Sequence, residues 1–133
     1  ISAVDARFYY GRARRSGRYG CPLRWPSLGM RMWFLNLGGG SSDCGEDGRL
    51  NAATVGGRSM YFLVRTQAGL WLGDRARRIK RIYRHPKRVG RSRWLLRPYF
   101  SPIAGGFPTS PVTAIVRGGR VRSFELNVGA AGE

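Results

Sequence analysis

The sequence predicts a mainly β fold, in which a small antiparallel sheet carries long basic loops. Short runs of aromatic and aliphatic residues, each of strand length, lie between glycines and prolines. The 133 residues include 20 Gly and 7 Pro, which break the chain too often for long helices. Hydrophobic residues still make up 42% of the chain and aromatic residues 12%, as in a packed domain. We therefore expect one domain over residues 1–133.

The first part of the chain alternates between strand-like and basic segments. Phe8–Tyr10 predicts a short strand from its aromatic side chains, and it runs into the basic loop 11–20. Met30–Leu37 is the clearest strand, because Pro26 and Gly29 precede it and three glycines follow it. The two-residue period of a strand divides its side chains between two faces. One face holds Arg31, Trp33 and Leu35, and the other holds Met32, Phe34 and Asn36.

In the middle of the chain, Met60–Thr66 predicts a second strand, which residues 70–72 extend or follow with a short strand of their own. Asp74–Tyr83 is the only candidate helix. Asp74 is a suitable cap, and apolar residues recur at helical spacing after it. A twisted basic hairpin fits the same residues nearly as well.

The last part of the chain predicts a loop and then a hairpin. Prolines and glycines make residues 98–111 irregular. Val112–Val116 and Val121–Val128 are strand-like, and Gly118–Gly119 between them forms the turn.

The charge balance points to a polyanionic partner. The chain has 24 Lys and Arg against 7 Asp and Glu, a net charge of +17. Only Lys80 and Lys87 are lysines, so nearly all of this charge is guanidinium, which forks onto phosphate and stacks on flat rings. A high-GC genome also enriches arginine, but the net charge attracts polyanions either way. No apolar run approaches the length that a membrane-spanning helix needs.

Cys21 and Cys44 leave two interpretations open. They are too few for a disulfide framework, and His85 alone does not complete a four-ligand zinc site. They either form one bridge that closes a loop of about 23 residues or remain two reduced thiols.

No pattern in the sequence predicts catalysis, a cofactor or a metal. The acidic loop that ends near Gly48 does not have the spacing of a helix-loop-helix calcium site, and we expect it to be solvated. The single histidine, His85, lies in a basic run and shares no motif with a carboxylate. The glycine-rich stretches lack the Lys-Ser/Thr of a phosphate loop. We therefore expect no enzyme activity.

The pattern of basic and aromatic residues favours binding to nucleic acid. Basic clusters lie at residues 7–31, 75–97 and 117–122, and aromatic residues are interleaved with them. Arginines neutralise phosphates, and aromatic rings stack on unpaired bases. Arg31 and Trp33 share one face of the same predicted strand, as on sheets that bind single-stranded RNA. The alternative is that Trp33 is a core residue.

Three segments carry a resemblance to a known family. Tyr9–Arg15 reads Tyr-Tyr-Gly-Arg-Ala-Arg-Arg, Arg31–Gly40 reads Arg-Met-Trp-Phe-Leu-Asn-Leu-Gly-Gly-Gly, and Met60–Gly69 is an apolar run that follows. In this order they resemble the N-terminal RNA-binding domain of coronavirus nucleocapsid proteins, over about half the chain. Met32 and Leu35–Asn36 stand where that family has aromatic residues, and residues 75–97 are more basic than its usual stretch. The resemblance therefore indicates a distant nidovirus relative.

The resemblance implies a protruding β-hairpin finger on the sheet. Arg14 and Arg15 would lie at its base, Arg18 and Arg24 on it, and Arg31 with Trp33 on the adjoining palm. It further implies packaging of genomic RNA, in the virion and the host cytoplasm, without catalysis. The predicted RNA-binding residues offer arginines to phosphates and two aromatic rings to bases: Tyr10, Arg12, Arg14, Arg15, Arg18, Arg24, Arg31 and Trp33.

Two other classes of protein share this composition. One is a structural RNA-binding protein of a ribonucleoprotein, such as an organellar ribosome, that needs RNA to fold. The other is a secreted cationic toxin or ribonuclease in which Cys21 and Cys44 are bridged. For the nucleocapsid reading we expect single-stranded RNA as partner, with weak sequence preference, no membrane and no small-molecule substrate. We expect the isolated domain to be a monomer.

Overall fold

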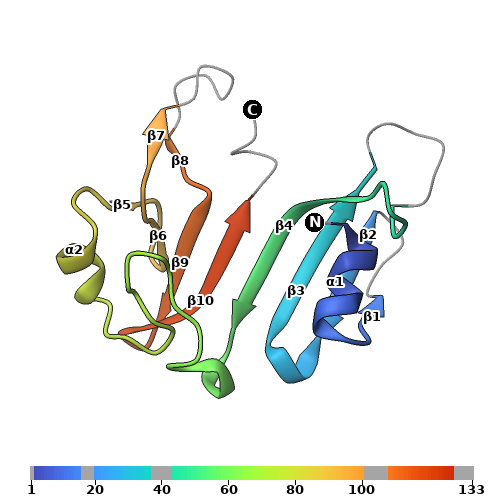
Figure 1. The fold of residues 1–133 in the computed structure, drawn as a ribbon. Helices are drawn as coiled ribbons and strands as arrows, with labels where there is room; N and C mark the ends of the chain where they lie inside the picture. The colour runs from blue at the N-terminus through green and yellow to red at the C-terminus, as the bar shows by residue number, and fades with distance from the viewer. Residues whose placement is uncertain (1, 16–19, 37–42, 101–107, 128–133) are drawn as a thin grey trace.

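The fold is built on one open sheet of eight antiparallel strands (Figure 1). The computed structural model describes residues 2–15, 20–36, 43–100 and 108–127. In spatial order the strands are β1 (Arg14–Arg15), β2 (Cys21–Trp25), β3 (Met30–Leu35), β4 (Arg49–Gly56), β10 (Arg120–Asn127), β9 (Val112–Arg117), β6 (Arg93–Leu95) and β5 (Lys87–Arg88). A separate pair is formed by β7 (Tyr99–Phe100) and β8 (Pro108–Thr109). The predicted fold class, mainly β with an antiparallel sheet, is confirmed.

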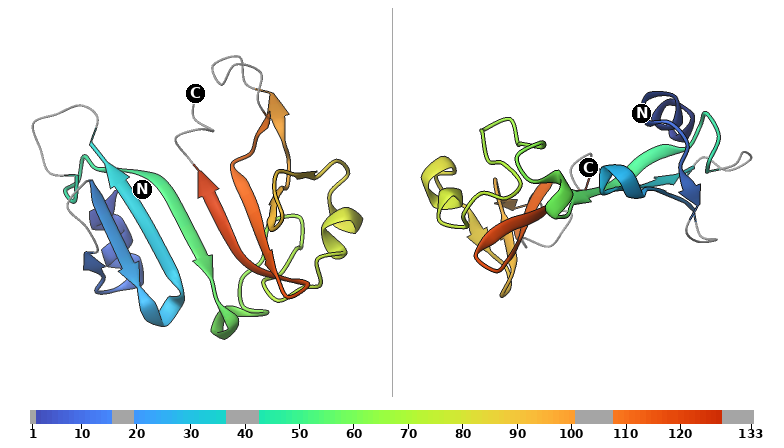
Figure 2. Two further views of the ribbon diagram at one scale, coloured as in Figure 1. Left: turned by 180° about the vertical axis from the view of Figure 1, so that it is seen from behind. Right: turned by 90° about the horizontal axis from the view of Figure 1, so that it is seen from below.

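The helices lie on one side of this sheet, which we call the covered face. They are α1 (Ala3–Tyr10) and α2 (Arg78–Ile82), whereas the 3-10 turns η1 (Pro26–Leu28) and η2 (Arg58–Met60) follow the ends of β2 and β4. Helix α1 packs on β2 and β3, whereas the chain from η2 to α2 packs on β9 and β10. Seen from below, α1 and this chain lie on the same side (Figure 2, right). We call the other side the open face.

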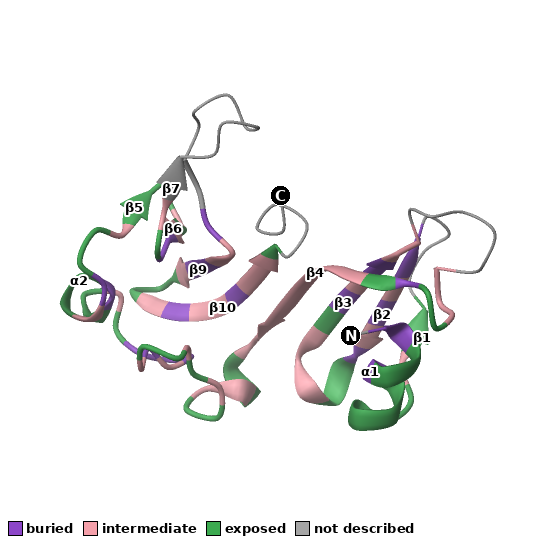
Figure 3. Ribbon diagram, turned by 45° about the horizontal axis from the view of Figure 1, so that its top comes forward, coloured by how far each residue is buried: buried purple, intermediate pink, exposed green. Residues whose placement is uncertain are grey.

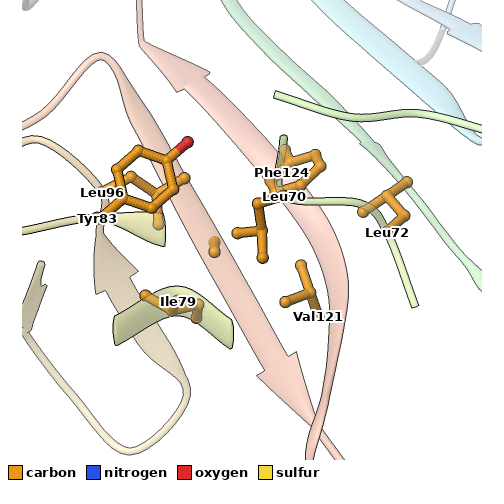
Figure 4. Close-up of a cluster of buried hydrophobic side chains, with 8 residues drawn as sticks. Leu70, Leu72, Ile79, Tyr83, Leu96, Val121 and Phe124 are labelled. Carbon is orange, nitrogen blue, oxygen red and sulfur yellow. The ribbon is translucent and has the colours of Figure 1, made fainter. Parts of the chain in front are cut away.

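Two apolar clusters on the covered face form the core. Under α1, Ala3 and Ala6 pack on the buried side chains of Leu23, Trp25 and Phe34. The second cluster holds α2 and the preceding chain on β9 and β10, and Figure 4 shows it from within. Its buried members are Leu70, Leu72, Ile79, Tyr83, Leu96, Ala114, Val121 and Phe124.

The prediction of a strand at Phe8–Tyr10 is wrong, because these residues form the end of α1. Ser2 begins the helix with a capping box: the Asp5 backbone N–H donates to its hydroxyl oxygen at 3.1 Å. In return, the backbone N–H of Ser2 donates to the Asp5 carboxylate at 3.0 Å. At the other end, the N–H of Gly11 donates to the Arg7 carbonyl. These local hydrogen bonds outweigh the strand propensity of the aromatic side chains.

Acid is expected to remove the stabilisation that this capping box provides. The pKa of Asp5 lies below its ordinary value of 3.8, because the backbone N–H and then the hydroxyl of Ser2 donate to its carboxylate. A lowered pKa gives stability that is present above the unfolded-state pKa and is lost as the pH falls through the folded-state pKa. In urea titrations, Asp5→Asn should therefore unfold earlier than the wild type at about pH 7, and this gap should close as the pH falls through the folded-state pKa of Asp5. A gap of equal size in acid would contradict this role of Asp5.

The predicted strand Met60–Thr66 is also wrong. This segment leaves η2 as a loop that folds back on itself, where Phe62 N–H donates to the Leu72 carbonyl at 2.8 Å and Leu72 N–H donates to Val64 at 2.9 Å. The strand next to β3 in the sheet is instead β4, which pairs with both β3 and β10. The sequence pattern predicts no element for the residues of β4. Pairing on both sides therefore decides this strand, although its Ala-Ala-Thr centre has little strand propensity.

The prediction that residues 98–111 are irregular is wrong in part, since β7 and β8 pair within this range. The other predictions of elements hold in full or in part. The strand predicted at Met30–Leu37 is β3, and the C-terminal hairpin is β9 and β10. Both turn glycines, Gly118 and Gly119, have positive φ, as a two-residue hairpin turn requires. The predicted helix Asp74–Tyr83 is reduced to α2, because Asp74 accepts the Trp71 N–H at 2.8 Å instead of capping the helix.

The N-terminal part of the sheet is tied down by a disulfide bond. Cys21, at the start of β2, is bridged to Cys44 in the segment before β4, so the thiol alternative is wrong for this structure. β1 and β2 pair as a hairpin where the resemblance implies a protruding finger, and residues 16–19 between them lie outside the described residues. This hairpin is an integral part of the sheet, since β2 pairs along its whole length with β3.

Candidate nucleic-acid interface

Three arginines lie side by side across the first three strands of the sheet. In the antiparallel registers Arg14 is opposite Arg24, and Arg24 is opposite Arg31. The same row continues to Thr54 on β4 and Glu125 on β10. Opposite residues on neighbouring strands lie about 5 Å apart and point to the same face. The sheet therefore brings three guanidinium groups together from separate parts of the sequence.

The row points to the open face. Arg24 lies between Leu23 and Trp25 on β2, and both neighbours are buried under α1. Because strand side chains alternate, Arg24 and its partners in the row face away from α1. Arg14 and Arg31 are exposed and Arg24 is half-buried. On β10 two less buried residues separate the buried Val121 and Phe124, so buried and less buried stretches follow one another along this strand (Figure 3).

A groove with a volume of about 570 Å³ lies on this face. It runs from the turn between β2 and β3 across β4 to the β9–β10 hairpin. Five of its lining residues are arginines, and Glu125 is the one carboxylate among the residues lining it. The arginines are Arg24, Arg31, Arg93, Arg117 and Arg122.

Glycines allow the strands to approach closely at one end of this groove. A Cβ atom on Gly56 would collide with the Ser123 Cβ and with the carbonyl oxygen of Arg122. Gly29, in the turn before β3, has φ 58° and lies against the carbonyl oxygen of Gly56. Side chains at these positions would push β4 away from its neighbours.

A β-bulge turns Arg122 toward the groove. The pairing of β10 with β9 shifts register between Val121 and Ser123, so Arg122 is the extra residue. Val121 and Phe124 both lie in the core, and Arg122 and Ser123 both line the groove. A strand without the bulge would direct only one of the two middle residues to the open face.

One ion pair neutralises part of the groove. Arg93 donates two hydrogen bonds to Glu125, at 2.6 Å and 3.0 Å. These bonds raise the pKa of Arg93 above its already high ordinary value, so its charge is permanent. Four lining arginines remain outside this pair. Like charges placed directly opposite each other destabilise a sheet, so the Arg14–Arg24–Arg31 row is expected to be relieved by a bound polyanion.

Trp33 lies on the open face next to this row. A depression of about 300 Å³ is lined by Pro22, Trp33 and Ala52, and it shares Arg31 and Thr54 with the groove. Trp33 is half-buried, so it is neither sealed in the core nor fully offered to solvent.

The structure brings four of the predicted RNA-binding residues to the open face: Arg14, Arg24, Arg31 and Trp33. Two others lie toward the covered face. The Tyr10 ring packs edge-on against Trp25 at 5.9 Å, and Arg15 is opposite the buried Leu23 and donates to the Gly20 carbonyl at 2.8 Å. Arg12 is exposed between α1 and β1, and Arg18 lies outside the described residues.

Three arginines of the groove were missed by sequence reasoning. Arg93, Arg117 and Arg122 reach it because β10 pairs with β4, which places the C-terminal hairpin next to the N-terminal strands. The sequence marks them only as members of basic clusters, and no local pattern indicates this pairing.

Neither a metal centre nor a membrane span is found in the part of the chain that the structure describes. There, no three residues of the types His, Cys, Asp and Glu are grouped to hold a metal ion. No helix within the described ranges is long and apolar enough to cross a membrane. Comparisons of this chain with protein-family models, with curated proteins and with solved structures gave no match.

Proposed function

We infer that this chain is an RNA-binding domain that holds single-stranded RNA along the open face by arginine–phosphate contacts. The observation that carries the proposal is the Arg14–Arg24–Arg31 row, which continues into a groove lined by further arginines. Release of counterions from the phosphates supplies most of the affinity, so binding weakens steeply with salt and depends little on sequence. Trp33 flanks the row, and its indole ring is the candidate for stacking on a base.

The narrower proposal is a viral nucleocapsid domain that packages genomic RNA without catalysis. It is supported by the resemblance of Tyr9–Arg15 and Arg31–Gly40 to that family and by the hairpin β1–β2. Two buried apolar clusters and the bridge between Cys21 and Cys44 favour a domain that folds without RNA. A cooperative melt of the free domain in circular dichroism would support this reading over a ribosomal component that folds only on RNA.

Arg14 and Arg15 provide a matched pair of substitutions. Arg14 belongs to the row on the open face, whereas Arg15 is opposite the buried Leu23. Arg14→Gln is expected to lower the slope of log affinity against log salt by about 0.7, the value of one single-stranded phosphate contact. Arg15→Gln removes the same charge and should leave the slope almost unchanged. Fluorescence anisotropy with labelled oligouridylate at several salt concentrations measures both slopes.

Equal slopes for the two variants would contradict an RNA path over the open face. The same samples, run on a denaturing gel after incubation, test the ribonuclease alternative. Intact RNA is the expected result.

A further inference from the structure

A second basic surface lies at α2, away from the groove. We call it the α2 surface: Lys80, Arg81, Arg84, His85 and Arg97, all exposed. These side chains surround a basin of about 680 Å³, whose apolar walls include Tyr83 and Leu96. The sequence pattern predicts a basic cluster here but gives it no separate role.

The α2 surface is held in place by the core. Ile79 and Tyr83 anchor the helix in the second apolar cluster, and the Tyr83 hydroxyl donates to the Thr66 hydroxyl oxygen at 2.7 Å. The Arg97 guanidinium lies over the Tyr83 ring at 5.9 Å, and the Lys80 ammonium lies over Trp94 at 5.6 Å. Such contacts orient the cations while leaving their charge uncompensated.

Among the residues that the structure describes, no carboxylate lines the basin. The acid closest in sequence, Asp74, is buried, accepts the Trp71 N–H, and lies 3.8 Å from Arg78, which is outside the α2 surface. The four Lys and Arg cations of the α2 surface therefore repel one another, and a bound anion would relieve this repulsion. A row of phosphates is the ligand whose charge and acceptor oxygens match this cluster.

The α2 surface and the groove belong to opposite faces of the sheet. Tyr83 and Leu96 pack with Ala114 and Phe124 on the covered face. The next residues along β9 and β10, Ile115 and Glu125, line the groove on the open face. A short RNA segment in the groove cannot reach α2, because the sheet lies between them.

We propose that the α2 surface binds the phosphate backbone of a second RNA segment, so that one domain holds two segments on opposite faces. This inference rests on the proposed RNA-binding function and adds a second site to it. A domain of this kind joins two strands, or two parts of one strand, without forming a dimer.

The test uses hexauridylate, which is too short to reach both faces. Three triple substitutions remove equal charge: R24Q/R31Q/R122Q in the groove, K80Q/R81Q/R84Q on the α2 surface, and R7Q/R58Q/R65Q as the control. The control arginines are exposed and line neither the groove nor the basin. Native mass spectrometry counts bound hexamers, and energy transfer between donor-labelled and acceptor-labelled hexamers reports their joining by one domain.

We expect two hexamers on the wild type and on the control, with energy transfer, and one hexamer without transfer on each of the other two variants. One hexamer on the wild type, with the α2 variant binding as tightly as the control, would overturn the second site and leave the groove proposal standing. No hexamer on the wild type, or a groove variant that binds like the control, would instead count against the proposed function. If the α2 variant does not melt cooperatively, R84Q/R97Q, which removes two charges of the same basin, replaces it.

Discussion

Replacing Arg24, Arg31 and Arg122 together by Gln is expected to weaken the binding of RNA to the groove about 100-fold at about 0.1 M salt. All three line the groove, and they come from three different strands. Three lost phosphate contacts lower the slope of log affinity against log salt by about 2. Between about 1 M and 0.1 M salt, a slope that is smaller by about 2 corresponds to an affinity about 100-fold lower at 0.1 M. Anisotropy titrations over this range of salt measure the slope and the affinity together.

The variant R7Q/R58Q/R65Q is the control for this prediction, because it has the same net charge and leaves the groove intact. It should lose only the small part of the affinity that follows from net charge, with a smaller change of the salt slope than the groove variant. If both variants lose affinity and slope equally, RNA binds to the basic surface as a whole, and the groove has no special role.

Removing the disulfide bond is expected to lower the free energy of unfolding by about 3 kcal/mol. The bridge joins Cys21 to Cys44 at a sequence separation of 23 residues and so restricts the unfolded chain. A loss of this size is a large part of the stability of an ordinary domain. Urea unfolding of C21A/C44A should resemble that of the wild type with reductant, and reductant should not change the variant further.

A wild type whose urea midpoint does not respond to reductant would contradict this prediction. The result also bears on the compartment, since disulfide bonds rarely persist in a reducing cytosol. A host-cytoplasm location requires that the reduced domain remains folded, and the same titration measures this.

The sequence predicts those elements whose signals are local. The strand β3 is aliphatic and aromatic except for Arg31 and lies between turn residues, and the hairpin of β9 and β10 has two turn glycines. α1 also has a local signal, since Ser2 and Asp5 form its capping box, but three aromatic residues in a row point to a strand instead. The prediction fails at α1 because the strand propensity of the aromatic residues is given more weight than the capping box.

The middle of the chain shows what local patterns cannot predict. Residues 49–56 are weakly apolar, yet they form a strand because β3 and β10 lie on either side of them. The more apolar Met60–Thr66 is then left to cover the sheet. In the candidate site, too, only the local part is predictable from the sequence: Arg31 and Trp33 share a face because strand side chains alternate. The pairing of β4 with β10 brings three more arginines to them, Arg93, Arg117 and Arg122.

Both edges of the eight-stranded sheet are only two residues long and wholly basic. One edge is Arg14–Arg15 and the other is Lys87–Arg88. Short, charged edges discourage two sheets from joining through their free backbone groups. Protection of this kind is electrostatic, so it fails when the charge is screened or neutralised. Copies crowded along a polyanion would thus lose the barrier that keeps them apart in dilute solution, and self-association should first appear there.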